Sequence, residues 1–390
     1  MSSEWQEGKL GDFIELKRGY DLPQAKRIAG RFPLVSSSGI TDSHNEPMAK
    51  GPGVVTGRYG TIGQVFYIED DFWPLNTTLY VRDFKSNDPK FISYLLRTVD
   101  FFAYSDKAAV PGVNRNHLHE AMVRLPGLDT QKHIANVLAT LDDRIALLRE
   151  TNATLEAIAQ ALFKSWFVDF DPVHARARGE EPAGLSPEVA ALFPDSFEES
   201  ELGMVPKGWD CGNLGDVLKI AYGKNLPTAK LLESGFPVFG GNGRIGFYSQ
   251  YLYEQRQVLV ACRGAASGKI NQSAPKSYVT NNSLVLESNE RVPFGYLKGF
   301  MSLSDLSAYV TGSAQPQVTI DNLKGFKIMI PSQSVTKAFE SLSSELEERT
   351  QQNNDQAQTL ATLRDTLLPR LISGQLRLPE ALAHLGDTLA

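Results

Sequence analysis

Two periods of apolar residues alternate along this chain. Short runs rich in Val, Ile, Leu and aromatic residues have the length and composition of β-strands. They lie at 53–56, 64–68 and 78–81, and similar runs return at 257–261 and 283–286. The glycine-rich segment 57–63 separates the first two runs and is typical of a turn, because glycine adopts positive φ at little steric cost.

A longer period of three and four residues begins after Pro126 and again after Pro331. It is carried by Ile134, Val137, Leu141, Leu148, Leu155, Ile158 and Leu162, and then by Leu342, Leu346, Leu360, Leu363 and Leu367. Such alternation forms a heptad seam, which two helices bury against each other. We predict two long helices that pair as an antiparallel coiled coil; the alternative is that each helix packs on its own globular part.

Polar residues interrupt both seams near the middle. They are Arg144 and Thr151 in the first helix and Arg349, Asn353 and Gln356 in the second. A buried Asn or Gln at a seam position lowers stability but fixes register and orientation. A helix of roughly 36 residues spans about 54 Å at about 1.5 Å per residue, so a pair of them would separate two globular parts by a fixed distance.

The sequence also contains an internal repeat. Trp5, Leu10-Gly11-Asp12 and Gly19 recur 204 residues later as Trp209, Leu214-Gly215-Asp216 and Gly223. Further on the offset is 205, as in Arg58 with Arg263, Gly63 with Gly268, Asn76 with Asn281, and Pro126 with Pro331. Such a repeat indicates duplication, and a pseudo-two-fold molecule suits a bipartite target. The fold class is therefore α+β, with two similar domains separated by the long helices.

These patterns divide the chain into six parts. We predict a first globular domain at 1–128, a long helix at 129–168, an acidic linker at 169–205, a second globular domain at 206–333, a second long helix at 334–378 and a C-terminal tail at 379–390.

Composition is ordinary for a globular protein, with 390 residues, 42% hydrophobic and 22% charged. No apolar run approaches the roughly 18–20 residues that cross a bilayer, and the N-terminus lacks signal-peptide features. We therefore expect a cytoplasmic protein with no membrane contact, whose Cys211 and Cys262 are reduced, buried thiols.

The net charge of −6 is unevenly distributed. The linker holds nine acidic residues against two Arg, whereas 206–333 holds thirteen Lys and Arg against eight acidic residues. Bulk charge therefore neither supports nor excludes DNA binding, and a local basic face remains open.

No convincing catalytic pattern is present. Gly241 to Gly246 fits G-x-G-x-x-G but is better explained as a turn, since the first repeat lacks the pattern. Glu15-Leu16-Lys17 has nuclease-like spacing, yet Lys219 stands at the matching position of the second repeat. His117, His119 and His133 have no histidine counterparts, so we expect surface or hydrogen-bonding roles rather than metal ligation.

The glycine-bounded turns offer polar side chains instead. Arg and Asn read the edges of guanine and adenine through paired hydrogen bonds. The DNA-binding candidates are Arg58, Tyr59, Asn76, Thr77, Arg115, Asn116, Arg244, Arg263, Lys269 and Asn282. Residues kept in both repeats, such as Asn76 and Asn281, favour a role in the shared scaffold, whereas residues that differ favour discrimination between two sequences.

Several runs resemble the specificity (S) subunits of type I restriction-modification systems. They are Pro126 to Ala135, Val137-Leu138, Leu141 to Ile145, Leu162 to Pro172, Glu201 to Trp209 and Leu368 to Gly374. The likeness covers essentially 3–378 and includes the two-repeat layout. The second long helix departs from it, with Ser334 to Ala338 in place of the Gln-Lys-His-Ile-Ala start.

The resemblance implies a non-catalytic subunit. The globular domains would be target-recognition domains that each read one half of a split site on double-stranded DNA. Two methyltransferase (M) subunits and, through them, motor-nuclease restriction (R) subunits would dock on the chain. The heptad pattern assigns the spacer and partner positions of the two long helices to Ile134, Leu141, Leu148, Leu155, Leu162, Leu346, Asn353, Leu360 and Leu367. No cofactor or metal is expected in this chain; S-adenosylmethionine, ATP and Mg2+ would belong to the partner subunits.

Competing hypotheses remain at this point. One is a coiled-coil scaffold, or the specificity module of another DNA-modifying defence system. The other is a single-chain modifying or cutting enzyme, which would require an S-adenosylmethionine or metal site that the sequence does not display.

Overall fold

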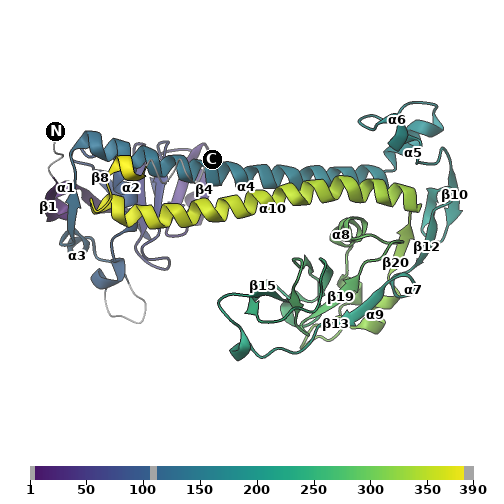
Figure 1. Ribbon diagram of the computed structural model, residues 1–390. Coiled ribbons are helices and arrows are strands. Elements are labelled where there is room, and N and C mark those ends of the chain that lie inside the picture. The colour runs from purple at the N-terminus through teal and green to yellow at the C-terminus, as the bar shows by residue number, and fades with distance from the viewer. Residues whose placement is uncertain (1–4, 106–111, 382–390) are drawn as a thin grey trace. The chain divides into compact units, whose positions relative to one another are not determined.

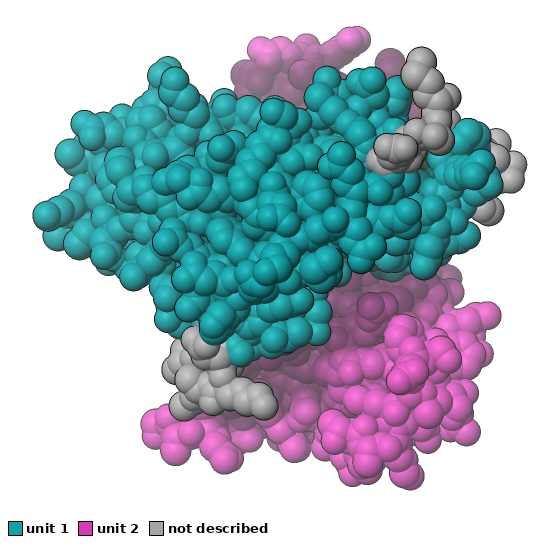
Figure 2. Space-filling model, turned by 90° about the vertical axis from the view of Figure 1, so that its left-hand side faces the viewer, with its two compact units in different colours: residues 1–149, 354–390 teal, residues 150–353 magenta. Residues whose placement is uncertain are grey.

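The computed structural model describes residues 5–105 and 112–381. Contacts divide the chain into two compact units, shown in different colours in Figure 2. Unit 1 comprises residues 1–149 and 354–390, and unit 2 comprises residues 150–353. The division therefore falls within the two long helices rather than at their ends, where the sequence patterns placed the domain boundaries.

Unit 1 is built from short strands and helices. Its strands are β1 (Gln6–Lys9), β2 (Glu15–Arg18), β3 (Phe32–Ser36), β4 (Gly39–His44), β5 (Gly53–Gly57), β6 (Val65–Ile68), β7 (Trp73–Pro74), β8 (Thr78–Asp83) and β9 (Met122–Leu125). Its shorter helices are α1 (Leu10–Phe13), η1 (Gln24–Lys26), α2 (Pro89–Arg97), η2 (Phe101–Tyr104) and α3 (Arg115–His119). The sheets have the orders β2-β8-β5-β6, β4-β3-β7 and β1-β9, and all pairs are antiparallel except β3 with β7.

Unit 2 repeats this plan. Its strands are β10 (Phe197–Ser200), β11 (Gly203–Pro206), β12 (Asp210–Asn213), β13 (Lys219–Tyr222), β14 (Phe236–Gly240), β15 (Gly243–Tyr248), β16 (Val258–Ala261), β17 (Ile270–Gln272), β18 (Tyr278–Val279), β19 (Ser283–Glu287) and β20 (Lys327–Ile330). Its shorter helices are α5 (Asp171–Ala177), α6 (Pro187–Ala190), α7 (Leu214–Val217), η3 (Thr228–Lys230), η4 (Gly264–Ala266), α8 (Phe294–Leu303), η5 (Ser307–Tyr309) and α9 (Ile320–Lys324). The sheet orders are β13-β19-β16-β17, β15-β14-β18 and β12-β20, with an added β10-β11 hairpin.

Equivalent backbone hydrogen bonds occur within each of the two units. Leu10 N donates to Ala121 O at 2.8 Å, and Leu214 N donates to Phe326 O at 2.7 Å. A β-bulge interrupts the β3–β4 ladder between Leu34 and Val35, and its counterpart interrupts the β14–β15 ladder between Val238 and Phe239. Bulges re-aim the chain at a defined position. The duplication read from the sequence therefore extends to the details of the backbone.

The predicted long helices are present as α4 (Leu128–Phe167) and α10 (Gln333–Ile372), each of 40 residues. In unit 1 the first part of α4 and the last part of α10 lie side by side (Figure 1) and share one hydrophobic core with α2. Leu138, Leu141, Leu360 and Leu371 are buried in that core. Helix–helix packing and packing on the globular part thus occur together, because each helix presents more than one apolar side.

The start of α4 is fixed by one buried side chain. Gln131 Nε2 donates to Asn87 Oδ1 at 2.8 Å and to Pro126 O at 2.9 Å, while its Oε1 accepts from Asp88 N at 3.0 Å. Gln131 therefore ties α4 to the beginning of α2. At the matching position of α10, Thr336 bonds back to Ser332 O within its own first turn.

The acidic segment 169–205 is folded rather than extended. It contains α5, α6 and β10, and Val173, Phe193 and Val205 are buried in the core of unit 2. Apolar residues spaced between the acids supply this packing. Both cysteines are free; Cys262 is buried, as predicted, whereas Cys211 is only half-buried.

Membrane-spanning helices and the C-terminal tail can be described only for part of the chain. No helix within 5–105 or 112–381 has the length and apolar character to cross a membrane. Of the predicted tail 379–390, residues 379–381 are described and Ala381 is buried, and the rest lies outside the described residues.

Candidate nucleic-acid interface

Three loops of unit 1 meet at one end of its larger sheet. Arg58 N, just after β5, donates to Thr77 O at 2.9 Å, and Val113 N donates to Arg58 O at 3.0 Å. Tyr59 forms an isolated β-bridge with Gly112. These bonds bring together the β5–β6 loop, the β7–β8 turn and the segment before α3. Four of the candidate residues, Arg58, Tyr59, Asn76 and Thr77, are thereby collected on a shared backbone frame.

Arg58 and Tyr59 form the most accessible pair of this frame. The Arg58 guanidinium lies 4.6 Å from the centroid of the Tyr59 ring, a cation–π contact. Tyr59 is 37% exposed, and a Cβ placed on Gly112 would meet its ring at 2.3 Å. Glycine at 112 is therefore needed for the ring to lie on the backbone. An exposed aromatic ring with an adjacent guanidinium offers both a stacking surface and hydrogen-bond donors.

Asn76 and Thr77 are less free. The Asn76 side chain donates to Asp21 Oδ1, and Asn76 O accepts from Arg18 Nε at 3.4 Å. Thr77 Oγ1 is buried without a hydrogen-bond partner among the described residues. The amide of Asn76 thus holds two loops together, in keeping with the scaffold role that its repetition at Asn281 favours.

Arg115 and Asn116 lie one step further along the chain, in α3. Both are exposed, and Asn114 caps the helix by accepting from Asn116 N at 3.0 Å. On the buried side of α3, His119 Nε2 accepts from Leu16 N at 2.9 Å. Burial, together with the charge of Arg115, lowers the pKa of His119. His119 therefore has the predicted hydrogen-bonding role, and Arg115 and Asn116 are displayed beside the collected loops rather than within them.

In unit 2 the same frame carries different side chains. Cys262 N donates to Asn282 O at 2.9 Å, and Ala261 N donates to Lys269 O at 2.9 Å. Asn271 Nδ2 donates to Gly241 O at 2.8 Å, which joins the β14–β15 turn to the group. Arg263, Lys269 and Asn282 are all exposed on these loops. These three residues and Arg244, near the start of β15, are the four candidates of unit 2. The hydrogen bonds bring the loops that carry them together.

The structure changes the residue of unit 2 that corresponds to Arg58. Val113 N bonds to Arg58 O in unit 1, and Val318 N bonds to Cys262 O in unit 2. Tyr59 bridges Gly112, whereas Arg263 bridges Gln317. The backbone counterpart of Arg58 is thus Cys262, and that of Tyr59 is Arg263. Pairing Arg58 with Arg263 by sequence was wrong, because the extra residue of the second repeat lies after Arg263, in the loop that contains η4.

The β14–β15 hairpin accounts for the G-x-G-x-x-G motif. Gly240 pairs with Gly243 at the tip, and Gly243 has φ of +106°, so the motif is a turn, as predicted. Arg244 pairs with Phe239, and at the equivalent place Ile40 pairs with Val35. Ile40 is 63% exposed. The two hairpins therefore present an apolar side chain in one unit and a cationic one in the other.

One exposed loop was missed by the sequence reading. Thr311 and Gln317 exchange two backbone hydrogen bonds of 2.8 Å, which close a hairpin-like loop beside Arg263. The loop presents the exposed polar residues Ser313, Gln315 and Gln317. Its signal was Gly312 within a polar run, where φ is +88°.

The nuclease-like spacing at Glu15 has a structural explanation. Glu15 pairs with Arg82 across β2 and β8, and in unit 2 Lys219 pairs with Glu287 across β13 and β19 at 2.7 Å. The equivalent ion pair is kept with its charges exchanged. Within the described residues, no group of three or more His, Cys, Asp or Glu side chains is placed to hold a metal ion.

The long helices bury most of the predicted seam. Ile134, Leu141, Leu148, Asn353, Leu360 and Leu367 are buried, whereas Leu155, Leu162 and Leu346 are half-buried. Arg144, Arg349 and Gln356 are exposed. The prediction that these three residues interrupt the seam was therefore wrong. Ile145 and Ala357 occupy the buried positions beside them.

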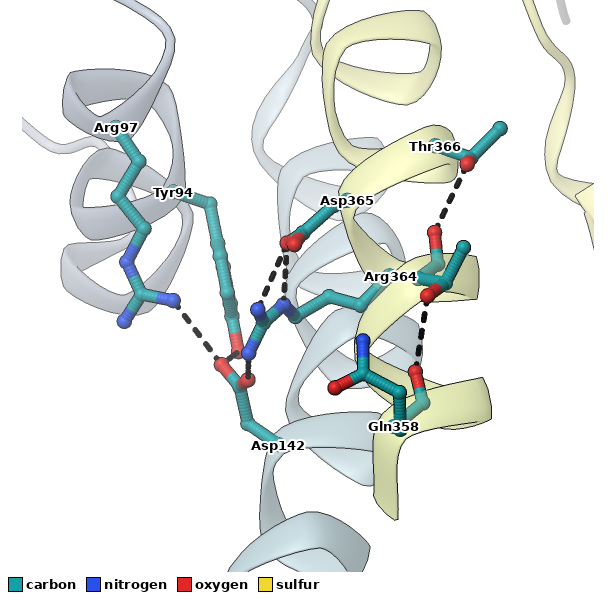
Figure 3. Close-up of polar contacts among 8 residues, drawn as sticks. Tyr94, Arg97, Asp142, Gln358, Arg364, Asp365 and Thr366 are labelled. Atoms are coloured by element: carbon teal, nitrogen blue, oxygen red, sulfur yellow. Dashed lines mark hydrogen bonds and ion pairs between the residues drawn. The ribbon is translucent and has the colours of Figure 1, made fainter. Parts of the chain in front are cut away.

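Polar contacts do cross between the helices, at the predicted position Asn353 and at Asp142, which was not predicted. In unit 1, Asp142 accepts from Arg364 at 2.6 Å, from Tyr94 at 2.8 Å and from Arg97 at 3.1 Å (Figure 3). In unit 2, Asn353 Nδ2 donates to Asn152 Oδ1 at 2.8 Å. Burial raises the pKa of Asp142, but the bonds from Arg364 and Tyr94 and the charge of Arg97 outweigh it, so the pKa lies below its ordinary value.

Comparison with known proteins assigns this chain to a family. The sequence model of the type I restriction modification DNA specificity domain matches residues 2–157 and 206–354. The chain belongs to this family, and it is a non-catalytic member, as are the specificity subunits of type I restriction-modification systems.

Individual relatives agree with this assignment. The type I restriction enzyme MjaIX specificity subunit of Methanocaldococcus jannaschii is 28% identical over 361 residues, which cover 85% of this chain and 79% of that protein. The HindI specificity subunit of Haemophilus influenzae is 24% identical over 465 residues, covering 96% and 100%. The crystal structure of a type I restriction-modification S subunit from M. genitalium shares the fold, with a TM-score of 0.63, 17% identity and coverage of 95% and 96%.

Proposed function

We propose that this chain is the DNA-reading subunit of a type I restriction-modification complex. Each globular part is a target-recognition domain that reads one half of a bipartite site on double-stranded DNA. The observation that carries this proposal is a repeated loop frame with unlike side chains: Tyr59 against Arg263, Thr77 against Asn282, and Ile40 against Arg244. One scaffold that carries two sets of side chains suits two different half-sites.

The proposed division of the chain follows the sequence patterns. Target-recognition domains at 1–128 and 206–333 are separated by α4 and α10, which act as an antiparallel coiled-coil spacer with pseudo-two-fold symmetry. Forty residues of helix span about 60 Å at about 1.5 Å per residue. The spacer would therefore set the number of base pairs between the half-sites.

The chemistry would come from partner subunits. Two methyltransferase subunits would bind S-adenosylmethionine and methylate adenine, and restriction subunits would use ATP and Mg2+ in the cytoplasm. Membership of a non-catalytic family supports the absence of a cofactor in this chain. Its own residues would hold DNA and position the partners.

The direct test is a map of methylated adenines. The chain would be co-expressed with its methyltransferase subunit in a host without adenine methylation, and the genome sequenced with detection of the modified base. We expect a bipartite motif that disappears when this chain is omitted. Replacing 206–333 by the same segment of a relative should change one half of the motif and leave the other. An uninterrupted motif, or methylation without this chain, would favour the alternative of a scaffold or of another defence system.

Helix length gives a second test. Inserting seven residues in both α4 and α10 adds about 10.5 Å, equivalent to about three base pairs at about 3.4 Å each. The permitted spacer should lengthen accordingly while both half-sites stay the same. An unchanged spacer would contradict the role of the helices as a ruler.

A further inference from the structure

One exposed turn carries the same lysine in both repeats. The turn is η1 in unit 1 and η3 in unit 2, and the sequence Leu-Pro-x-Ala-Lys around it ends at Lys26 and at Lys230. Between Trp5 and Pro33, Asp12 and Lys26 are the charged residues that recur 204 residues later. The positive charge at this turn is therefore shared by two units whose other charges in this segment differ.

The two kept charges differ in what they do for the fold. Asp12 accepts a hydrogen bond of 3.0 Å from the residue three positions before it, and its counterpart Asp216 accepts one of 2.8 Å from the same relative position. Lys26 and Lys230 are exposed, and among residues 5–105 and 112–381 neither ammonium group has a hydrogen-bond or ion-pair partner. A charge without a partner in its own chain does little for the fold, so its repetition points to a partner outside the chain.

The backbone of the turn is also the same in both units. Lys26 N donates to Pro23 O and Lys230 N donates to Pro227 O, both at 2.9 Å. Pro23 and Pro227 have φ of −56° and −60°, the range to which the proline ring restricts the chain. Equivalent rigid turns therefore carry the two lysines.

In unit 1 the turn is bonded on both sides to elements that carry recognition candidates. Before the turn, Asp21 accepts a hydrogen bond from the side chain of Asn76, in the β7–β8 turn. After the turn, Arg27 forms an ion pair of 3.5 Å with Asp42 of β4, the strand that also presents the exposed Ile40. Lys26 is thereby held beside the loops that would read the first half-site.

The same placement recurs in unit 2 with different side chains. Before the turn, Lys224 N donates to Val279 O of β18 at 2.9 Å. After it, Leu232 N donates to Phe247 O of β15 at 2.8 Å, and β15 carries the candidate Arg244. The kept lysine therefore has unlike candidates beside it in the two units.

We infer that Lys26 and Lys230 each bind a backbone phosphate of the DNA, next to the half-site that their unit reads. The inference rests on the proposed function. Phosphates are the same in every sequence, so the residues that hold them can be identical in both repeats while the residues that read bases differ. A lysine ammonium is a compact charge that suits a phosphate in this role. Each contact would fix the position of the loop frame along the duplex.

The salt dependence of DNA binding tests this role. The full chain with its methyltransferase subunits would be titrated, at several KCl concentrations, onto a duplex that carries the mapped site, with fluorescence anisotropy as the readout. Each phosphate contact contributes about 0.9 to the slope of log affinity against log salt concentration, so Lys26→Gln with Lys230→Gln should flatten the slope by about 1.8. Between about 50 and 200 mM KCl, the unchanged complex should therefore lose about tenfold more affinity than this double variant.

Two further variants separate charge from shape and place. Lys26→Arg with Lys230→Arg keeps both charges and should keep the slope. Lys50→Gln removes an exposed charge that lies before β5, whereas Arg58 follows that strand, and it should bind like the unchanged chain. All variants should melt at the temperature of the unchanged chain, because the substituted side chains are exposed.

The ratio of affinities for the mapped site and for duplexes with one changed base should stay the same in the double variant. A changed ratio would overturn the inference, because it marks a base contact. An unchanged slope would overturn it too, and fewer bound methyltransferase subunits at that slope, counted by native mass spectrometry, would identify a protein partner instead. In these cases the proposed function would stand. Absence of site-specific binding by the unchanged complex would overturn the proposed function, and this inference with it.

Discussion

Asn353 Nδ2 donates a hydrogen bond of 2.8 Å to Asn152 Oδ1, and Asn353 is only 3% exposed. Asn152 Nδ2 also donates to Thr350 O at 3.3 Å. A polar pair is therefore buried among the apolar contacts of α4 and α10 within unit 2. Polar groups at such a position stabilise one register over others at a cost in overall stability.

Removing one or both members of this pair should have opposite effects. Asn353→Leu removes the hydrogen bond from Asn353 Nδ2 to Asn152 Oδ1 and should lower the free energy of unfolding by about 0.5–1.5 kcal/mol. Asn152→Leu with Asn353→Leu should recover stability but allow several pairings, seen as mixed species by native mass spectrometry. Gln356→Leu, at an exposed position, should change stability by about 0.5 kcal/mol or less. A double variant as unstable as the single one would contradict a register role.

Asp142 should make unit 1 sensitive to acid. Its pKa is below the ordinary value in the folded chain, so its contribution is complete above about pH 4 and is lost as the pH falls through the folded value. Asp142→Asn should lower the free energy of unfolding by about 1.5–3 kcal/mol at neutral pH, because it removes charged hydrogen bonds.

The measurement is urea denaturation between pH 2 and 7. The difference between the unchanged chain and Asp142→Asn should shrink toward low pH. The neighbouring exposed residue provides the control, and Asp143→Asn should show no such convergence. A constant difference over the whole range would argue against an ionised Asp142.

His119 should add a second pH dependence in a higher range. Its pKa is lowered by burial and by Arg115, so the neutral ring accepts from Leu16 N in the fold. Because the unfolded chain takes up the proton first, stability should be complete above about pH 6.5 and fall as the pH drops through the lowered folded value. Replacement by glutamine, His119→Gln, should flatten the melting temperature between pH 5 and 7, whereas His117→Gln, exposed on the same helix, should leave the slope as it was.

Substitutions in each unit should affect recognition of only one half-site. Arg58→Ala and Arg115→Ala should each relax recognition of one half-site, and Arg263→Ala that of the other. A lost base contact costs about 1–3 kcal/mol, a factor of about ten to a hundred in the methylation rate of that half-site. The assay compares methylation of DNA duplexes that carry a single base change in either half. Equal losses in both halves would point to general misfolding.

Much of this molecule follows from the sequence. The strands β5, β6 and β8 lie where the short apolar runs predicted them, and α4 and α10 begin within a residue or two of Pro126 and Pro331. These features are local, because the apolar period and the position of proline act over a few residues. The duplication was equally visible, since it needs only a nearly constant offset.

The phase of the helix seam was decided by tertiary structure. Between Leu346 and Leu360, steps through Arg349, Asn353 and Gln356 and steps through Thr350, Asn353 and Ala357 alternate equally well. The folded chain buries Asn353 and Ala357 and exposes Arg349 and Gln356. Steps of three and four residues lie on nearly the same face of a helix, and only the neighbouring helix fixes the rotation that separates them.

The match between the recognition loops was decided in the same way. Identity of side chains paired Arg58 with Arg263, whereas the hydrogen bonds of Val113 and Val318 pair Arg58 with Cys262. A loop can take an extra residue anywhere along its length without changing the strands on either side. The place of the insertion therefore depends on long-range backbone pairing.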